Sequence, residues 1–296
     1  MSIETHIKKN YSLKSLSTFD IGGKARYFVA IHTIEEMQQI MYFVQKESLS
    51  FLVVGKGSNI LFDDRGFDGL IILNAIHFMQ CQKGSVVVGA GYPFSLLGVK
   101  TAKQGWSGLE FAACIPGTVG GAIYMNAGAN GYQTQDVLVS VSYVDLMGMV
   151  DQKKKEELQF SYRFSSFQRM KGVIVAGQFM LTKDKDSVKK QLDMISYRTH
   201  TQPYGEKSVG SIFRNLDHIS AGALIEQCGL KGKKIGDAEV SVKHANFIIN
   251  KGHATAQDVL DLMMLLKEIV KDKTGEELQE EVCFIPYQGE YGKSLS

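Results

Sequence analysis

The sequence has no apolar run near the length of a membrane-spanning helix, and its polar first ten residues lack the apolar core of a signal peptide. It also has few cysteines, with no CxxC pair among them: Cys81, Cys114, Cys228 and Cys283. Because they stand in apolar or glycine-rich surroundings, we expect buried thiols in a reducing cytosol, with neither disulfides nor a metal site. We therefore expect a cytoplasmic protein without membrane insertion.

An excess of charge of one sign is missing as well. The 296 residues include 33 Lys and Arg against 31 Asp and Glu, and this net charge of +2 argues against a polybasic surface for nucleic acid. Balanced totals still allow a local anion-binding pocket. A hydrophobic share of 44% is ordinary for a globular chain, and the length suggests two domains or one large domain. Nothing in the sequence indicates the oligomeric state.

Apolar periodicity predicts a mixture of strands and helices. Thr33 and Glu36 fit a capping box for a helix between strands at 25–30 and 51–54, which gives a β-α-β opening. Other predicted strands cover 71–73, 86–88, 137–150, 172–181 and 281–285, with a charged turn at 151–157. Other predicted helices cover 94–104, 188–198 and 220–228, and a long one follows Thr255 and ends at Gly275. We place a domain boundary near the polar break at 183–187.

Two glycine-rich segments are candidate ligand loops. The first, Gly55-Lys56-Gly57-Ser58-Asn59, follows the strand that ends at Val54, and its small residues would let backbone N–H groups converge on a pyrophosphate. Such a segment is more often an ordinary turn. It lacks the spacing of a Rossmann or Walker loop, and a strand rather than a helix follows it. The second, 108–131, suits either a flat ligand against the backbone or a tight crossing of the core, and we predict loops there.

Six motifs resemble, in order, those of the UDP-N-acetylenolpyruvoylglucosamine reductase (MurB) family: STFDIGGKARYF, GKGSNILF, GLEFAACIPGTVGGAIYMNAGA, YRFSSF, GSIFRN and AEVSVKHANFIIN. The resemblance covers most of the chain. It implies an α+β protein with an FAD-binding fold of the vanillyl-alcohol-oxidase (PCMH) type. We expect two FAD subdomains at 1–75 and 76–184 and a C-terminal α+β substrate domain at 185–296.

The resemblance also implies an activity. It implies NADPH-dependent reduction of UDP-N-acetylglucosamine enolpyruvate to UDP-N-acetylmuramate through FAD, in the synthesis of peptidoglycan precursors for the bacterial cell wall. The FAD is expected to be non-covalent, and no histidine in either glycine-rich loop could tether it. The expected FAD-binding residues are Gly55, Lys56, Gly57, Ser58, Asn59, Gly117, Thr118, Gly120, Gly121, Asn126 and Ala127.

Three residues match the catalytic positions of the family. Arg163 would bind the substrate carboxylate, since a guanidinium is always charged and can pair through two parallel bonds. Ser211 matches the proton-donating serine. Glu281 matches the glutamate that acts as an acid or orients the enolate, and its neighbour Glu280 is the alternative. Without the family, a surface arginine, a turn serine and a solvated charge run are the more frequent interpretations.

Other residues are candidates for substrate binding. A sugar nucleotide needs several cations and amide donors, and we expect these from Tyr162, Arg198, Arg214 and Asn215. The cluster Lys231, Lys233 and Lys234 could meet phosphate or remain solvated. His244 could be near the ligand, but we favour a structural role.

Two departures from the family pattern stand near the catalytic glutamate. Cys283 occupies the place of the usual arginine, and Ile285-Pro286-Tyr287 replaces the usual Ile-Gly ending. No long insertion separates Arg163 from Ser211, so we expect the shorter type, which lacks the tyrosine-bearing loop over the substrate. An oxygen-using FAD oxidase and a catalytically silent binding protein are the alternatives. Retention of all three catalytic residues counts against both.

Overall fold

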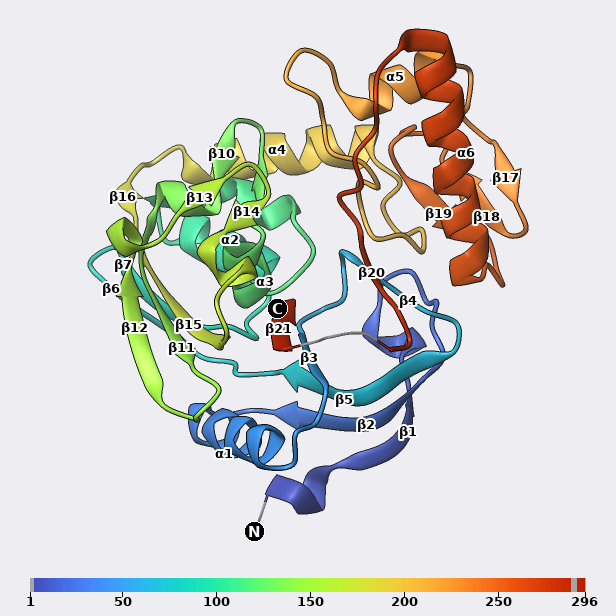
Figure 1. Ribbon diagram of the computed structural model, residues 1–296. Coiled ribbons are helices and arrows are strands. Elements are labelled where there is room, and N and C mark those ends of the chain that lie inside the picture. Colours follow the sequence, from blue (N-terminus) through green and yellow to red (C-terminus); the bar gives the residue numbers. More distant parts are fainter. Residues whose placement is uncertain (1–2, 289–291, 296) are drawn as a thin grey trace.

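The first sheet of the molecule brings both halves of the chain together. The computed structural model describes residues 3–288 and 292–295. Its first sheet has the strand order β1-β2-β5-β3-β21 (Figure 1). β1 is antiparallel to β2, and the other neighbours are parallel. The strands are Lys8–Ser12 (β1), Lys24–Ile31 (β2), Phe51–Val54 (β3), Gly66–Asn74 (β5) and Gly292–Leu295 (β21).

The helix α1 (Ile34–Lys46) confirms the predicted β-α-β opening. The Thr33 hydroxyl accepts a hydrogen bond from the Glu36 N–H at 3.1 Å, which satisfies one of the unpaired donors of the first turn. The helix buries Met37, Ile40, Met41 and Val44, the face that its apolar spacing predicts.

The second sheet is antiparallel, with the order β12-β11-β15-β7-β6. Its strands are Met79–Gln82 (β6), Ser85–Gly89 (β7), Leu138–Val144 (β11), Val150–Lys154 (β12) and Val173–Met180 (β15). The predicted charged turn at 151–157 is wrong, because most of it belongs to β12, and the predicted strand 137–150 is wrong at 145–149, where the turn lies. β12 is an edge strand with mostly exposed side chains, so it carries no buried alternation, and edge strands tolerate lysines.

We call the part of the chain around the first sheet the first region, and the part around the second sheet the second region. Two helices, α2 (Phe94–Lys103) and α3 (Val119–Tyr124), belong to the second region. The prediction of loops throughout 108–131 is wrong at α3. Thr118 caps this helix by accepting from the Gly121 N–H, and Val119 and Ile123 are fully buried in the core of this region. Packing of this kind outweighs the poor helix propensity of the two glycines. The helix α4 (Ser187–Thr201) then leads to the C-terminal region (Figure 1).

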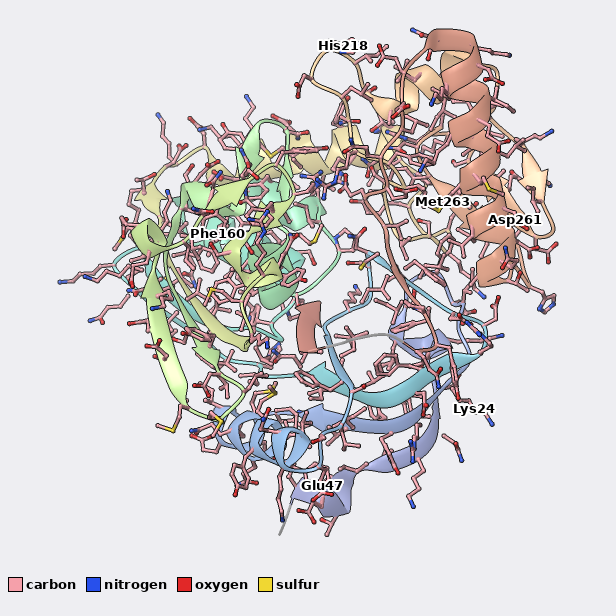
Figure 2. The ribbon with its side chains drawn as sticks, in the orientation of Figure 1. Lys24, Glu47, Phe160, His218, Asp261 and Met263 are labelled. Atoms are coloured by element: carbon pink, nitrogen blue, oxygen red, sulfur yellow. The ribbon has the colours of Figure 1, made fainter. Side chains whose placement is uncertain are left out.

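The C-terminal region packs two helices against a small antiparallel sheet. The sheet contains Lys234–Ile235 (β17), Ala238–Val240 (β18) and Ile248–Asn250 (β19), and the helices are Ala221–Gln227 (α5) and Ala256–Thr274 (α6). The predicted cap at Thr255 and end at Gly275 are confirmed, and Gly275 has a φ of +77°. In Figure 2, Met263 lies on the side of α6 toward the rest of the molecule and Asp261 on the outer side.

The chain then returns to the first region. Cys283–Ile285 (β20) pairs in parallel with Ile60–Phe62 (β4), and β21 pairs with β3. The Asp64 carboxylate accepts from the N–H groups of Ala256 and Gln257 at 2.9 and 3.2 Å, so the first region caps α6. The predicted ranges 1–75, 76–184 and 185–296 stay predictions, and residues 1–2, 289–291 and 296 lie outside the described residues.

The expectation of four buried thiols is wrong for two of them. Cys114 and Cys228 are buried, but Cys283 is half-buried and Cys81 is exposed. Cys81 lies on β6, the other edge of the second sheet, where most side chains face solvent. Among the described helices, none combines the length and the apolar character needed to cross a membrane.

Short strand pairs complete the fold. They are Trp106–Ser107 (β8) with Thr182–Lys183 (β16), Gly128–Ala129 (β9) with Tyr132–Gln133 (β10), and Phe160–Ser161 (β13) with Phe164–Ser165 (β14).

Candidate active site

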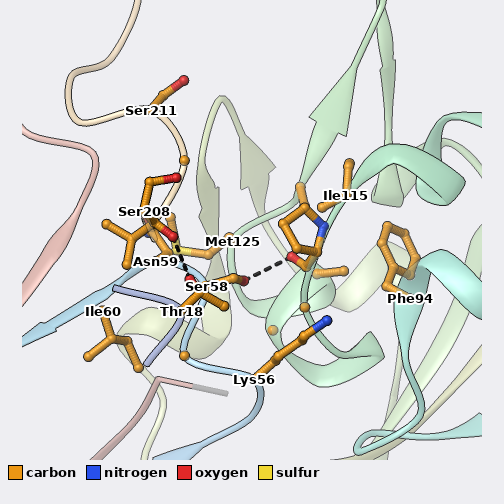
Figure 3. A pocket seen from close by; sticks show the side chains of 18 of the residues that line it. Thr18, Lys56, Ser58, Asn59, Ile60, Phe94, Ile115, Met125, Ser208 and Ser211 are labelled. Atoms are coloured by element: carbon orange, nitrogen blue, oxygen red, sulfur yellow. Dashed lines mark hydrogen bonds between the residues drawn. The ribbon is translucent and has the colours of Figure 1, made fainter. Parts of the chain in front are cut away.

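A cavity of about 340 Å³ lies where the three regions meet. Its walls come from the loop 55–60, the segment between 115 and 128, and the segment 202–211, with Arg163 and Glu281 between them. In Figure 3, Ser208 and Ser211 lie on the side opposite Phe94 and Ile115. The cavity therefore joins both glycine-rich segments to residues that are distant in sequence.

Close approaches to neighbouring segments fix the backbone of the loop 55–59. Gly57 has a φ of +64°, and a Cβ there would lie 1.8 Å from the carbonyl oxygen of Leu16. At Gly55 a Cβ would lie 2.3 Å from the Thr118 hydroxyl oxygen. The Ser58 hydroxyl donates to the Pro116 carbonyl at 2.8 Å, so the two glycine-rich segments touch (Figure 3). Only residues without a side chain fit these two approaches.

The donors and rings around the loop fit a flat cofactor with an anionic linker, such as FAD. The backbone N–H groups of residues 56–59 donate to no other residue in the described parts of the chain. Unpaired donors in a glycine-rich turn form the kind of concavity that binds a pyrophosphate. Across the cavity, Phe94, Ile115 and Met125 supply an apolar wall against which an aromatic ring system can lie.

Arg163 reaches this cavity from the turn between β13 and β14. Its φ is +57°, a left-handed conformation that is uncommon for a residue with a long side chain. The Arg163 Nε donates to the Glu281 carboxylate at 2.5 Å, and the two side chains are only 20% and 11% exposed. Charge-assisted bonds in such a partly buried place are stronger than those at the surface. The pair therefore presents a fixed cation beside a carboxylate.

Short backbone ladders place Ser211 beside Glu281. The Ser211 backbone bridges to Phe247, and the Ile212 carbonyl accepts from the Glu281 N–H at 2.8 Å. The Asn59 side-chain amide donates to the Glu281 carbonyl at 3.0 Å. The glutamate is thus held on one side by the serine segment and on the other by the first glycine-rich loop.

The two neighbouring glutamates have different surroundings. The Glu280 carboxylate accepts from Lys267 on α6 at 2.5 Å and does not line the cavity. Glu281 lines the cavity and pairs with Arg163. The geometry favours Glu281 over the alternative Glu280.

Most predicted site residues line the cavity: Gly55, Lys56, Gly57, Ser58, Asn59, Gly117, Thr118, Gly121, Ala127, Arg163, Arg198, Ser211 and Glu281. Arg198 extends from α4, and its guanidinium donates to the Gln202 side chain at 2.7 Å. Since Gln202 also lines the cavity, this cation is held at the cavity wall.

Five predicted residues do not line the cavity: Gly120, Asn126, Tyr162, Arg214 and Asn215. The Gly120 N–H donates to the Ala90 carbonyl at 2.8 Å. Both N–H groups of the Asn126 amide are used, because they donate to Gln133 and the Ser161 carbonyl, and its oxygen accepts from the Gln135 N–H. The Tyr162 ring lies 4.7 Å from the Arg163 guanidinium.

The lysine cluster and His244 also lie outside the cavity lining. Lys231 and Lys234 bind the carboxylates of Glu226 and Glu239 at 2.5 and 2.6 Å. His244 packs edge-on against Phe247 and accepts at Nδ1 from the Asn246 N–H. Burial lowers the pKa of this imidazole, which fits a structural role.

Sequence reasoning missed the segment that crosses from α4 to Ser211. Tyr204 lines the cavity, and its hydroxyl donates at 2.8 Å to the carbonyl of Cys114, which precedes the lining residue Ile115. Burial raises the pKa of the Tyr204 hydroxyl. On the other side, the Thr18 hydroxyl donates to the Ser208 carbonyl at 2.7 Å (Figure 3). The sequence signal for this segment was Pro203 and Gly205 on either side of Tyr204, a pattern that predicts a turn but does not indicate a ligand.

Two family models match separate parts of the chain. An FAD binding domain matches residues 25–151, and the C-terminal domain of UDP-N-acetylenolpyruvoylglucosamine reductase matches residues 202–285. The predicted α+β fold with an FAD-binding part followed by this C-terminal part is confirmed.

Relatives and a solved structure agree over nearly the whole length. The chain is 53% identical over 293 residues to a UDP-N-acetylenolpyruvoylglucosamine reductase of Protochlamydia amoebophila, covering 99% of this chain and 98% of the relative. A reductase of the same name from Chlamydia abortus is 44% identical and covers 95% of both chains. The crystal structure of the Thermus caldophilus reductase has a TM-score of 0.80 at 33% identity, over 95% of this chain and 98% of the other. This chain belongs to the UDP-N-acetylenolpyruvoylglucosamine reductase family.

Proposed function

We propose that Arg163, Ser211 and Glu281 carry out the reduction of UDP-N-acetylglucosamine enolpyruvate at FAD held by the two glycine-rich segments, with NADPH as the hydride donor. One observation carries the proposal: a partly buried Arg163–Glu281 pair and Ser211 line the same cavity as the unpaired donors of the loop 55–59. The product is UDP-N-acetylmuramate, and the activity belongs to peptidoglycan precursor synthesis in a bacterial cytoplasm.

The first task of the site is to stabilise charge. The two glycine-rich segments would hold FAD, which would supply hydride transfer from NADPH to the methylene carbon of the enol ether. Negative charge then builds on the substrate carboxylate as an enolate. Arg163 binds this carboxylate, because its guanidinium stays charged and only its Nε is used by Glu281. The remaining N–H groups of Arg163 can pair with two carboxylate oxygens.

The second task is to supply a proton. Ser211 holds a hydroxyl proton for the carbon next to the carboxylate, and its position is fixed by the backbone ladder to Phe247 and Glu281. Glu281 keeps Arg163 aligned and, through the shared ladder, stays beside Ser211. The serine is a weak acid by itself, so its contribution depends on this fixed approach to a strongly basic carbon.

The sugar nucleotide lies toward the C-terminal region in this proposal. Arg198 at the cavity wall meets its diphosphate or carboxylate charge. Tyr162, Arg214 and Asn215 bind at the outer end, where the Asn215 N–H donates to the Tyr162 hydroxyl at 3.4 Å. The ranges 1–75 and 76–184 serve the FAD, and 185–296 serves the substrate.

The test is an absorbance spectrum of the purified protein through two anaerobic additions. The flavin bands should bleach with NADPH and return with UDP-N-acetylglucosamine enolpyruvate. Bands that return only with oxygen would favour an oxidase instead. A protein that binds FAD and the enolpyruvyl substrate but shows no bleaching with NADPH would be a silent binding protein. A colourless protein that cannot be reconstituted with FAD would overturn the cofactor site itself.

A further inference from the structure

We infer that Gln168 is a positioning residue for Arg163, an inference that rests on the proposed role of that arginine. Gln168 ends the 3-10 turn that follows β14, Ser166–Gln168. Its side-chain nitrogen donates to the Arg163 carbonyl at 2.9 Å and to the Tyr124 carbonyl at 3.0 Å. Because carbonyl oxygens only accept, both partners require the NH₂ end of the amide, and both of its hydrogens are used. Gln168 does not line the cavity.

The Arg163 turn needs such support. With a φ of +57°, the residue adopts a conformation that persists only where the surrounding structure holds it. Gln168 donates to the carbonyl of Arg163 itself, so it holds the residue that has the strained φ. On the other side of the same turn, the buried Asn126 amide donates to the Ser161 carbonyl at 3.0 Å. The two amides together fix the turn that directs the guanidinium toward Glu281.

The same side chain ties this turn to the cofactor wall. Tyr124 is the last residue of α3, where helix carbonyls have no partner within the helix. Its carbonyl accepts from the Ser165 hydroxyl at 2.7 Å as well as from Gln168. α3 starts directly after Gly117 and Thr118, which line the cavity. Gln168 therefore sets the position of the arginine relative to the part of the cavity wall that carries Gly117 and Thr118.

The deciding experiment compares three substitutions at Gln168. Gln168→Glu keeps the shape but turns two donors into acceptors that face carbonyl oxygens. Gln168→Met removes the donors without adding a charge, so it decides the matter if the glutamate variant does not fold. Gln168→Lys keeps donors for both carbonyls. The matched control is Gln178→Glu, because Gln178 binds Ser85 and Ser140 within the second sheet, away from the cavity.

We expect a split between the two half-reactions. Bleaching by NADPH should proceed at the wild-type rate in all variants. Return of the flavin bands with the enolpyruvyl substrate should slow about 100-fold in the glutamate and methionine variants, because small misplacements of a catalytic group have effects of this size. The lysine variant should recover most of that rate, and Gln178→Glu should match the wild type.

A second readout does not depend on turnover. The Arg163 Nε–H signal in ¹⁵N NMR spectra, assigned by its loss in Arg163→Lys, should shift in Gln168→Glu and return in Gln168→Lys, in FAD-free protein too. An unchanged signal and rate in folded Gln168→Glu and Gln168→Met would overturn the inference, as would a lysine variant as slow as they are. If wild-type flavin does not return with substrate, the proposed function fails, and the NMR comparison still decides the positioning.

Discussion

Replacing Gly57 by alanine should loosen the first glycine-rich loop and weaken FAD binding. The left-handed φ of +64° costs a residue with a Cβ about 1–2 kcal/mol. The new Cβ would lie 1.8 Å from the Leu16 carbonyl oxygen, so the backbone must shift, and overpacking of this kind costs about 1–3 kcal/mol. Together, the free energy of unfolding should fall by roughly 2–5 kcal/mol.

The assay is urea unfolding of the FAD-free protein by circular dichroism, followed by FAD titration with flavin fluorescence. Gly131→Ala is the matched control, since Gly131 has a φ of +82° but nothing within 4 Å of its Cβ position. For Gly131→Ala, the free energy of unfolding should fall only by the cost of the left-handed conformation, about 1–2 kcal/mol, and the affinity for FAD should not change. Equal unfolding midpoints for the two variants would refute the steric reasoning, and unchanged FAD affinity in Gly57→Ala would refute the role of the loop.

Three further predictions concern the catalytic residues and His244. Ser211→Ala should leave flavin reduction by NADPH nearly intact and slow the reoxidation of the flavin by the enolpyruvyl substrate about 10²–10⁴-fold, as measured by stopped-flow absorbance. Equal losses of rate in both half-reactions would contradict the assigned role. Arg163→Ala should reduce turnover of the enolpyruvyl substrate about 10²–10³-fold with FAD retained, and loss of the yellow colour would contradict this. The pKa of His244 lies below its ordinary value of 6.5 because the ring is buried, so its contribution to stability is present above pH 6.5 and is lost as the pH falls through the folded-state pKa. The thermal midpoint should therefore fall more steeply below pH 6.5 in the wild type than in His244→Gln, and parallel curves would rule out this residue as the cause.

Local patterns predicted the elements that bury a regular face. The stripe Val259, Leu262, Met263, Leu266 and Val270 marked α6, because a buried helix face repeats every three to four residues. β12 was missed because an edge strand needs no such face. The short helix α3 was missed because its stability comes from packing against distant residues, which no local pattern records.

The site could be predicted only in part. The resemblance pointed to Arg163, Ser211 and Glu281, and the structure brings all three to the cavity that the glycine-rich loops line. It did not indicate Tyr204 or Gln168, whose partners Cys114 and Tyr124 lie 90 and 44 residues away. Contacts at such separations depend on how the elements pack, so a sequence without an alignment gives no signal for them.

The return of the last segment to the first region affects how the protein matures during synthesis. Asn59 and Glu281, which share a hydrogen bond, are 222 residues apart. At ribosomal rates of about 5–20 residues per second, the glutamate emerges roughly 10–45 s after the loop that holds it. During that interval the nascent first sheet lacks β21, and β4 lacks its partner β20. The parallel edge of the sheet is thus exposed on the ribosome, and the active site can form only once Glu281 has left the exit tunnel.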